Sequence, residues 1–154
     1  MSDSWSVLRR LGAGGTAELF AVRSSRGRIA IEKRLFEHFA RDETAARLFA
    51  HEARVLRALG GTEGVPAFYE TGEREGRPCV RMELIPARAL GALTGGTEPM
   101  PVGQVLRVLR GLLAVLARVH TASDREGGTG ALRVVHGDVG PSNVLVRDDG
   151  RVAL

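Results

Sequence analysis

The chain has 154 residues, of which 44% are hydrophobic and 26% are charged, and its formal net charge is +4. This balance supports one ordinary domain with a hydrophobic core and excludes global disorder. Basic residues are scattered among acidic ones without a basic and aromatic cluster, which argues against nucleic-acid binding. The single cysteine, Cys79, excludes an internal disulfide and fits a reducing compartment.

The start of the chain and its apolar segments bear on targeting. Met1 is followed by Ser-Asp-Ser-Trp rather than by the apolar region of a secretory signal. The best candidate for a membrane span, residues 102–119, is interrupted by arginines. We therefore predict a cytoplasmic protein with no membrane segment in this chain.

The first half of the sequence alternates short strands with turns and then changes to helical periodicity. Strands are predicted at residues 7–11, 18–22, 29–35, 67–70 and 79–84. A helix is predicted at residues 42–59, where Gly60 and Gly61 end the pattern. The apolar positions that define its stripe are Leu48, Phe49, Val55, Leu56 and Leu59.

The second half is mainly helical. A short helix is predicted at residues 87–93, and a strongly amphipathic helix follows a loop at residues 102–120. A polar loop is predicted at residues 123–130. The chain then closes with a predicted hairpin, whose strands at 144–146 and 152–154 flank an Asp-Asp-Gly turn.

The first candidate functional feature is the glycine turn in Leu-Gly-Ala-Gly-Gly-Thr-Ala-Glu-Leu, residues 11–19. Because Gly12, Gly14 and Gly15 lack Cβ atoms, backbone N–H groups there could approach phosphate oxygens. A dinucleotide-binding turn would lead into a helix, whereas a strand is predicted here. Taken alone, the turn fits an ordinary hairpin equally well.

The second feature is Lys33, the only lysine among 22 basic residues. It lies on the strand after the glycine turn, from which a lysine can reach bound phosphates. Glu52 on the next helix could hold its ammonium group by an ion pair. An ordinary surface lysine and a solvated glutamate are the alternatives for each residue alone. The order is more informative: glycine hairpin, strand lysine, helix glutamate, apolar strand, then Asp138 five residues before Asn143.

With these elements in this order, the chain resembles the protein kinase fold, most closely the eukaryotic-like Ser/Thr kinases of bacteria. The resemblance covers residues 5–154, with 5–85 as N-lobe and hinge and 86–154 as the start of the C-lobe through the catalytic loop. It implies an α+β fold, in which an antiparallel sheet with helix C precedes the first part of a helical lobe. It also implies transfer of phosphoryl groups from ATP, with Mg²⁺, to Ser or Thr of a protein substrate.

The resemblance implies a role for each matching residue. Lys33 would orient the α- and β-phosphates, Glu52 would hold Lys33, and Asp138 would position the substrate hydroxyl. Asn143 would bind magnesium, and His136 would brace the catalytic loop. The implied nucleotide-binding residues are Leu11, Gly12, Gly14, Gly15, Leu19, Ala30, Lys33, Met82, Glu83, Ile85 and Leu145.

One departure concerns the strand lysine. The family pattern Val-Ala-x-Lys is one residue longer here, as Ile-Ala-Ile-Glu-Lys at residues 29–33. In strict register Glu32 would replace the lysine, and Lys33 would point to the other face of the sheet. We predict a β-bulge that lets Ala30 and Lys33 face the same side. Strict register remains the alternative.

Two further departures leave other functions open. Gly137 stands where the family has an arginine, and His-Gly-Asp also resembles small-molecule phosphotransferases that act on aminoglycosides or choline. The chain ends at Leu154, before the segment that delivers Asp-Phe-Gly in the family. A truncated kinase or pseudokinase that binds nucleotide or a partner is therefore an alternative. A partner chain would then cover apolar surface of the incomplete C-lobe.

Overall fold

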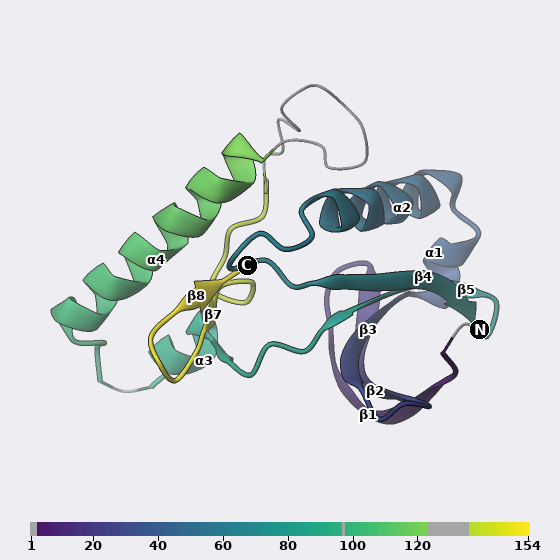
Figure 1. The fold of residues 1–154 in the computed structure, drawn as a ribbon, viewed down its shortest axis with the longest axis horizontal. Helices are drawn as coiled ribbons and strands as arrows, with labels where there is room; N and C mark the ends of the chain where they lie inside the picture. Colours follow the sequence, from purple (N-terminus) through teal and green to yellow (C-terminus); the bar gives the residue numbers. More distant parts are fainter. Residues whose placement is uncertain (1–2, 97, 123–135) are drawn as a thin grey trace. The chain divides into compact units, whose positions relative to one another are not determined.

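The computed structural model describes residues 3–96, 98–122 and 136–154 and divides the chain into two compact units (Figure 1). The first unit holds Met1–Arg57 and Ala67–Leu84, and the second holds Ala58–Pro66 and Ile85–Leu154. The loop predicted at residues 123–130 lies outside the described residues.

A five-stranded antiparallel sheet with the order β1-β2-β3-β5-β4 forms the first unit. Glu75 and Gly76 join β4 to β5 with φ values of 53° and 71°. Two consecutive left-handed residues form the hairpin turn whose twist matches paired antiparallel strands. All five predicted strands are present; β3 has the predicted bounds and the other four have shifted ends. The five strands are β1 (Trp5–Ala13), β2 (Ala17–Ser24), β3 (Ile29–Leu35), β4 (Phe68–Arg74) and β5 (Arg77–Glu83).

Two helices follow β3, namely α1 (Glu37–Ala40) and α2 (Glu43–Ala58). Asp42 begins α2, because its Oδ1 accepts hydrogen bonds from the backbone N–H groups of Thr44 and Ala45 at 2.8 and 3.0 Å. A carboxylate at this position satisfies N–H groups that have no partner inside the helix.

The core of the first unit lies between α2 and one face of the sheet. Phe49 and Ala53 of α2 are buried there against Ala17, Leu35 and Val80. Leu48 belongs to the predicted apolar stripe but is 65% exposed. The stripe that packs on the sheet is therefore narrower than the sequence pattern.

The second unit combines α4 (Val102–Thr121) with a small antiparallel sheet of order β6-β7-β8. Val108 of α4, Val144 and Val152 form its core. Figure 1 shows α4 beside the β7–β8 hairpin. Gly111 permits this close approach, because a Cβ atom there would lie 2.7 Å from Cγ2 of Val152. The shorter elements are β6 (Arg88–Ala89), α3 (Leu90–Thr94), β7 (Leu145–Val146) and β8 (Val152–Ala153).

The short helix predicted at residues 87–93 begins later than expected. Arg88 and Ala89 pair with Val146 and Leu145 of β7, and the helix starts at Leu90. The ladder to β7 supplies backbone hydrogen bonds that a local helical pattern cannot reveal, because the partner strand is distant in the sequence.

Helix α4 has two contrasting sides. Val108, Val115 and Val119 are buried, whereas Val102, Leu106 and Leu113 are 73%, 61% and 66% exposed. The predicted exposed apolar surface is thus present on this helix. No helix among the described residues is both long enough and apolar enough to cross a bilayer.

Candidate functional site

The register of β3 determines which side chains lie on the same face of the sheet as Lys33. Its pairing with both β2 and β5 runs without a register shift, so the predicted bulge is wrong. Lys33 lies opposite Leu19 and Val80, on the face that packs against α2. Side chains alternate along an unbulged strand, so Ala30 lies on the opposite face and Ile31 shares the face of Lys33.

Lys33 and Glu52 form an ion pair within the first unit. The Lys33 Nζ donates to Oε1 and Oε2 of Glu52 at 2.5 and 2.7 Å. The Lys33 side chain is 24% exposed and that of Glu52 is 56% exposed. Phe49, one turn before Glu52 on α2, places its ring 6.0 Å from the same Nζ. The ammonium is thereby fixed in position and remains open to solvent on one side.

The other face of β3 explains why no bulge is needed. Glu32 is fully buried and binds Arg34 at 2.7 Å and Arg81 at 2.8 Å, with Arg74 at 3.4 Å. Burial alone would raise the pKa of Glu32, but the hydrogen bonds from Arg34 and Arg81 outweigh it and hold this pKa below its usual range. Glu32 and Lys33 therefore both have ion-pair partners when β3 pairs in strict register.

The network around Glu32 extends to the edge of the sheet. Arg81 also binds Glu70 at 2.7 Å, and the indole N–H of Trp5 donates to Glu70 at 2.6 Å. Arg34 reaches Glu75 at 2.9 Å. Among the described residues, every buried side-chain nitrogen and oxygen has a partner. Sequence reasoning missed this network, because its members come from four strands.

The glycine hairpin joins β1 and β2 as predicted. The N–H of Gly14 donates to the carbonyl of Ala17 at 2.8 Å and closes the turn. A Cβ atom on Gly12 or Gly15 would meet no protein atom within 4 Å. Packing therefore does not require glycine at either position, and the space beside this backbone is open to a ligand. Leu11 is 37% exposed, and Leu19 pairs with Gly12.

The predicted nucleotide-binding residues Met82 and Glu83 end β5, and Ile85 follows two residues later. Met82 pairs with Ile31 and packs against the core, so it lies on the face of Lys33. The N–H of Glu83 donates to the carbonyl of Ala67 at 2.8 Å, and the Glu83 carboxylate accepts from the Ala67 N–H at 3.2 Å. Ile85 is half-buried and opens the second unit.

The predicted catalytic loop lies in the second unit. The Asn143 Nδ2 donates both to the backbone carbonyl and to Oδ2 of Asp138, each at 2.9 Å. The N–H of Asp138 donates to Nδ1 of His136 at 3.4 Å. Gly137 has φ of 71°, a conformation that costs an L side chain energy. The missing arginine at this position thus accompanies a backbone that favours glycine.

Two backbone contacts anchor this loop to α3. The N–H of Gly91 donates to the carbonyl of Pro141 at 2.8 Å, and that of Leu90 donates to Val144 at 2.7 Å. Val144 is 2% exposed, and Leu145 is half-buried in β7. The loop is therefore held at its C-terminal end, while Asp138 itself is exposed.

The structure thus forms two separate pairs, Lys33 with Glu52 in the first unit and Asp138 with Asn143 in the second. Within residues 3–96, 98–122 and 136–154, no three His, Cys, Asp or Glu side chains gather as a metal site. Asn143 uses its amide nitrogen on Asp138, which leaves its amide oxygen as the atom that could face a cation.

Curated relatives of this chain are bacterial kinases. It is 31% identical over 146 residues to the serine/threonine-protein kinase AfsK of Streptomyces griseus, covering 95% of this chain and 17% of the relative. It is 32% identical over 155 residues to the serine/threonine-protein kinase PknL of Mycobacterium tuberculosis, covering 100% of this chain and 36% of the relative. The chain therefore spans about a sixth to a third of these proteins. No family model matches it.

Solved structures show the same fold. The kinase domain of M. tuberculosis PknI superposes with a TM-score of 0.74 at 23% identity, covering 97% of this chain and 58% of that domain. A PknI double mutant gives a TM-score of 0.75, with 100% of this chain and 60% of that domain covered. The predicted α+β fold, an antiparallel sheet with a helix followed by the start of a helical lobe, is confirmed.

Proposed function

Because the chain is a homologue of bacterial serine/threonine-protein kinases and has a protein kinase-like fold, we propose that it takes part in ATP-dependent phosphoryl transfer to Ser or Thr of a protein substrate. The observation that carries this proposal is the two-oxygen contact of Lys33 with Glu52. A lysine held in this way on the strand after a glycine hairpin is the arrangement by which kinases position ATP phosphates.

The first unit would hold the nucleotide. The open space beside Gly12 and Gly15 fits phosphate groups, and the Lys33 ammonium would bind the α- and β-phosphates. Ile31 rather than Ala30 would lie beside the nucleotide, because it shares the face of Lys33. The assignments of Leu11, Gly14, Leu19, Met82, Glu83, Ile85 and Leu145 to the nucleotide remain predictions.

The second unit would act on the acceptor. Asp138 is exposed and would accept or orient the proton of a substrate hydroxyl, while Asn143 restrains its carboxylate from the side. When bound, Mg²⁺ would neutralise charge on the phosphates, and the amide oxygen of Asn143 would be one ligand. One neutral oxygen is a weak magnesium site, so phosphate oxygens and waters would supply most of the coordination.

We also propose that another polypeptide covers the exposed apolar side of α4. Leu106 and Leu113 are mostly exposed there, and side chains of this size are rarely left in such a row on an isolated surface. Such a partner would be compatible with either a catalytic or a non-catalytic protein.

The test is incubation of the purified chain with Mg²⁺ and ATP labelled at the γ-phosphate, with a generic protein acceptor. Lys33→Ala and Asp138→Ala should each lower labelling by about 100-fold or more, the range for removal of a positioned charge that stabilises the phosphates and of a positioned acid or base, respectively. Arg47→Ala and Glu73→Ala change exposed residues that belong to neither pair and should match the parent.

Equal labelling by all chains would overturn the assigned roles. No labelling by the parent would overturn transfer by this chain. A nucleotide-induced rise in melting temperature lost in Lys33→Ala would then favour a non-catalytic nucleotide-binding protein. Labelling of choline or an aminoglycoside in place of protein would favour the small-molecule alternative.

A further inference from the structure

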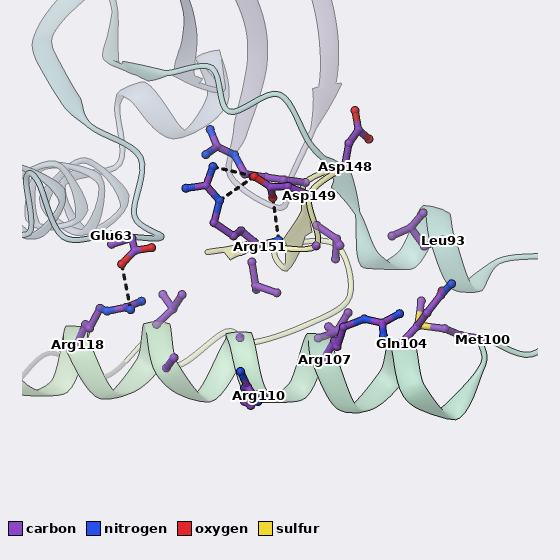
Figure 2. Close-up of a pocket in the computed structure, with 18 residues that line it drawn as sticks. Glu63, Leu93, Met100, Gln104, Arg107, Arg110, Arg118, Asp148, Asp149 and Arg151 are labelled. Carbon is purple, nitrogen blue, oxygen red and sulfur yellow. Dashed lines mark hydrogen bonds and ion pairs between the residues drawn. The ribbon is translucent and has the colours of Figure 1, made fainter.

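A groove of about 730 Å³ lies within the second unit. Helix α4 forms its floor, and the β7–β8 turn and the segment from α3 to α4 form its sides (Figure 2). Lys33, Glu52, Asp138 and Asn143 do not line it. Binding in this groove can therefore be separated from phosphoryl transfer.

The groove carries more positive than negative charge. Five arginines and three acidic residues line it. Two of these arginines are compensated, Arg118 by Glu63 at 3.0 Å and Arg151 by Asp149 at 2.7 Å. The excess of two positive charges comes from arginines elsewhere in the lining, and it creates a local potential that attracts anionic groups.

Three arginines of the lining have no ion-pair partner among the residues that the structure describes: Arg147, which is half-buried, and Arg107 and Arg110, whose exposure makes them the most accessible to a ligand. Arg107 and Arg110 stand three residues apart on α4, so their side chains emerge from neighbouring positions on the helix surface. Each guanidinium can receive a carboxylate through two parallel hydrogen bonds.

One end of the groove is less charged. Figure 2 shows Leu93, Met100 and Gln104 at the Arg107 end, and Arg118 with Glu63 at the other end. Leu93 and Met100 are half-buried, so they can contact an apolar side chain without first being uncovered. Methionine adapts its shape to such a contact. Gln104 can both donate to and accept from a peptide backbone.

We propose that this groove docks an acidic peptide segment of another protein. Two carboxylates would bind Arg107 and Arg110, and an apolar side chain would rest against Leu93 and Met100. Alternate residues of an extended peptide are about 6.6 Å apart, close to the spacing of neighbouring side chains on one face of a helix. The peptide would therefore carry an Asp-x-Asp pattern near a leucine. Phosphorylation of the docked protein at Ser or Thr rests on the proposed function, whereas the docking does not.

The mixed lining favours a peptide over nucleic acid. Asp148, Asp149 and Glu63 lie on the sides of the groove and would repel a continuous phosphate backbone. A peptide can instead place its acidic groups at Arg107 and Arg110 and neutral residues elsewhere. The side chains of Leu93 and Met100 also lack the charge and the hydrogen-bond donors that would bind phosphate groups.

The test is fluorescence anisotropy of a labelled peptide containing Asp-Ser-Asp and a nearby leucine, titrated with the whole chain at low salt. Arg107→Glu/Arg110→Glu should weaken binding by about tenfold or more, because reversal of close charges costs several times the thermal energy. Arg41→Glu/Arg47→Glu makes the same charge change at exposed residues of the first unit and should bind as the parent does. Arg107→Lys/Arg110→Lys should bind with intermediate affinity, since lysine keeps the charge without the planar fork.

Circular dichroism and melting temperature establish that each variant is folded before binding is compared. Replacing the two aspartates of the peptide by lysines should abolish binding, and replacing its leucine by serine should weaken it severalfold. Equal affinity of the parent and the Arg107→Glu/Arg110→Glu variant would overturn the proposal. Tighter binding of a single-stranded DNA oligonucleotide than of the acidic peptide would overturn it as well. Loss of labelling in the kinase assay with peptide binding intact would count against the proposed function alone.

Discussion

Glu32 and Lys33 are neighbours on β3, and their charged side chains differ in burial and in the number of their partners. Glu32 is fully buried and contacts three arginines, whereas Lys33 is partly exposed and contacts one glutamate. A buried charge is tolerated only when partners replace its lost hydration, so the Glu32 carboxylate has a structural role. An exposed pair contributes little stability, so Lys33 is free to be selected for a ligand.

The comparison extends to the sheet as a whole. The face toward α2 carries the core residues Leu35 and Val80 together with Lys33, while the opposite face carries the network from Trp5 to Glu75. The charged groups that matter for structure and those that matter for chemistry are thus on opposite sides of one layer. Substitutions on the two sides should separate stability from activity.

Glu32→Ala should produce the largest loss of stability. It leaves Arg34 and Arg81 buried without their shared carboxylate, and removal of one member of a buried pair costs about 3–5 kcal/mol. The free energy of unfolding in urea measures the loss. Glu73→Ala on β4 is the matched control, because Glu73 is exposed, and its effect should lie within about 0.5 kcal/mol. Similar effects of the two substitutions would show that the Glu32 carboxylate is no more important for stability than an exposed one.

The second prediction uses the lowered pKa of Glu32. Its folded-state pKa lies below the ordinary value of 4.5, so ionised Glu32 stabilises the fold fully above that pH. This contribution is lost as the pH falls below about 4.5 through the folded-state pKa. The stability difference between the parent and Glu32→Gln should therefore be constant near neutrality and shrink in acid. Urea unfolding across this pH range measures it. A difference that grows in acid would contradict the assignment.

Trp5→Phe should have a smaller effect at the edge of the network. Phenylalanine keeps an aromatic ring near Arg81 but loses the hydrogen bond to Glu70. Loss of one such bond costs about 0.5–1.5 kcal/mol, less than loss of the central carboxylate. Urea unfolding again provides the measurement, with Trp5→Leu as the variant that loses both contacts. An effect as large as that of Glu32→Ala would place the centre of the network at Trp5 instead.

The sequence was sufficient for features set by local patterns. The glycine turn, the helices α2 and α4 and the five strands of the main sheet follow from periodicity and turn residues within short windows. The ion pair of Lys33 and Glu52 was anticipated from the order of the elements, and the structure forms it. Its catalytic role and the domain boundaries at residues 85 and 86 remain predictions.

The register of β3 could not be read from the sequence. A shift of one residue exchanges the two faces of a strand, and both Glu32 and Lys33 are plausible at either face. The choice depends on Arg74 and Arg81, which lie more than 40 residues away and reach Glu32 only in the folded sheet. Likewise, Arg107 and Arg110 were counted among scattered charges, because only the β7–β8 hairpin makes their side of α4 part of a groove.

Lys33→Ala should have the smallest effect on stability and a large effect on function. Its partner Glu52 is more than half exposed, so water can replace the lost contact, and the expected loss is less than about 1 kcal/mol. The double-mutant cycle with Glu52→Ala, measured by urea unfolding, gives the coupling of the pair directly. Nucleotide binding by the same proteins supplies the functional comparison. A coupling as large as the whole effect of Glu32→Ala would mean that Lys33, too, has a structural role. A small coupling together with lost nucleotide binding would show that the face of β3 with Lys33 serves ligand binding and the face with Glu32 serves stability.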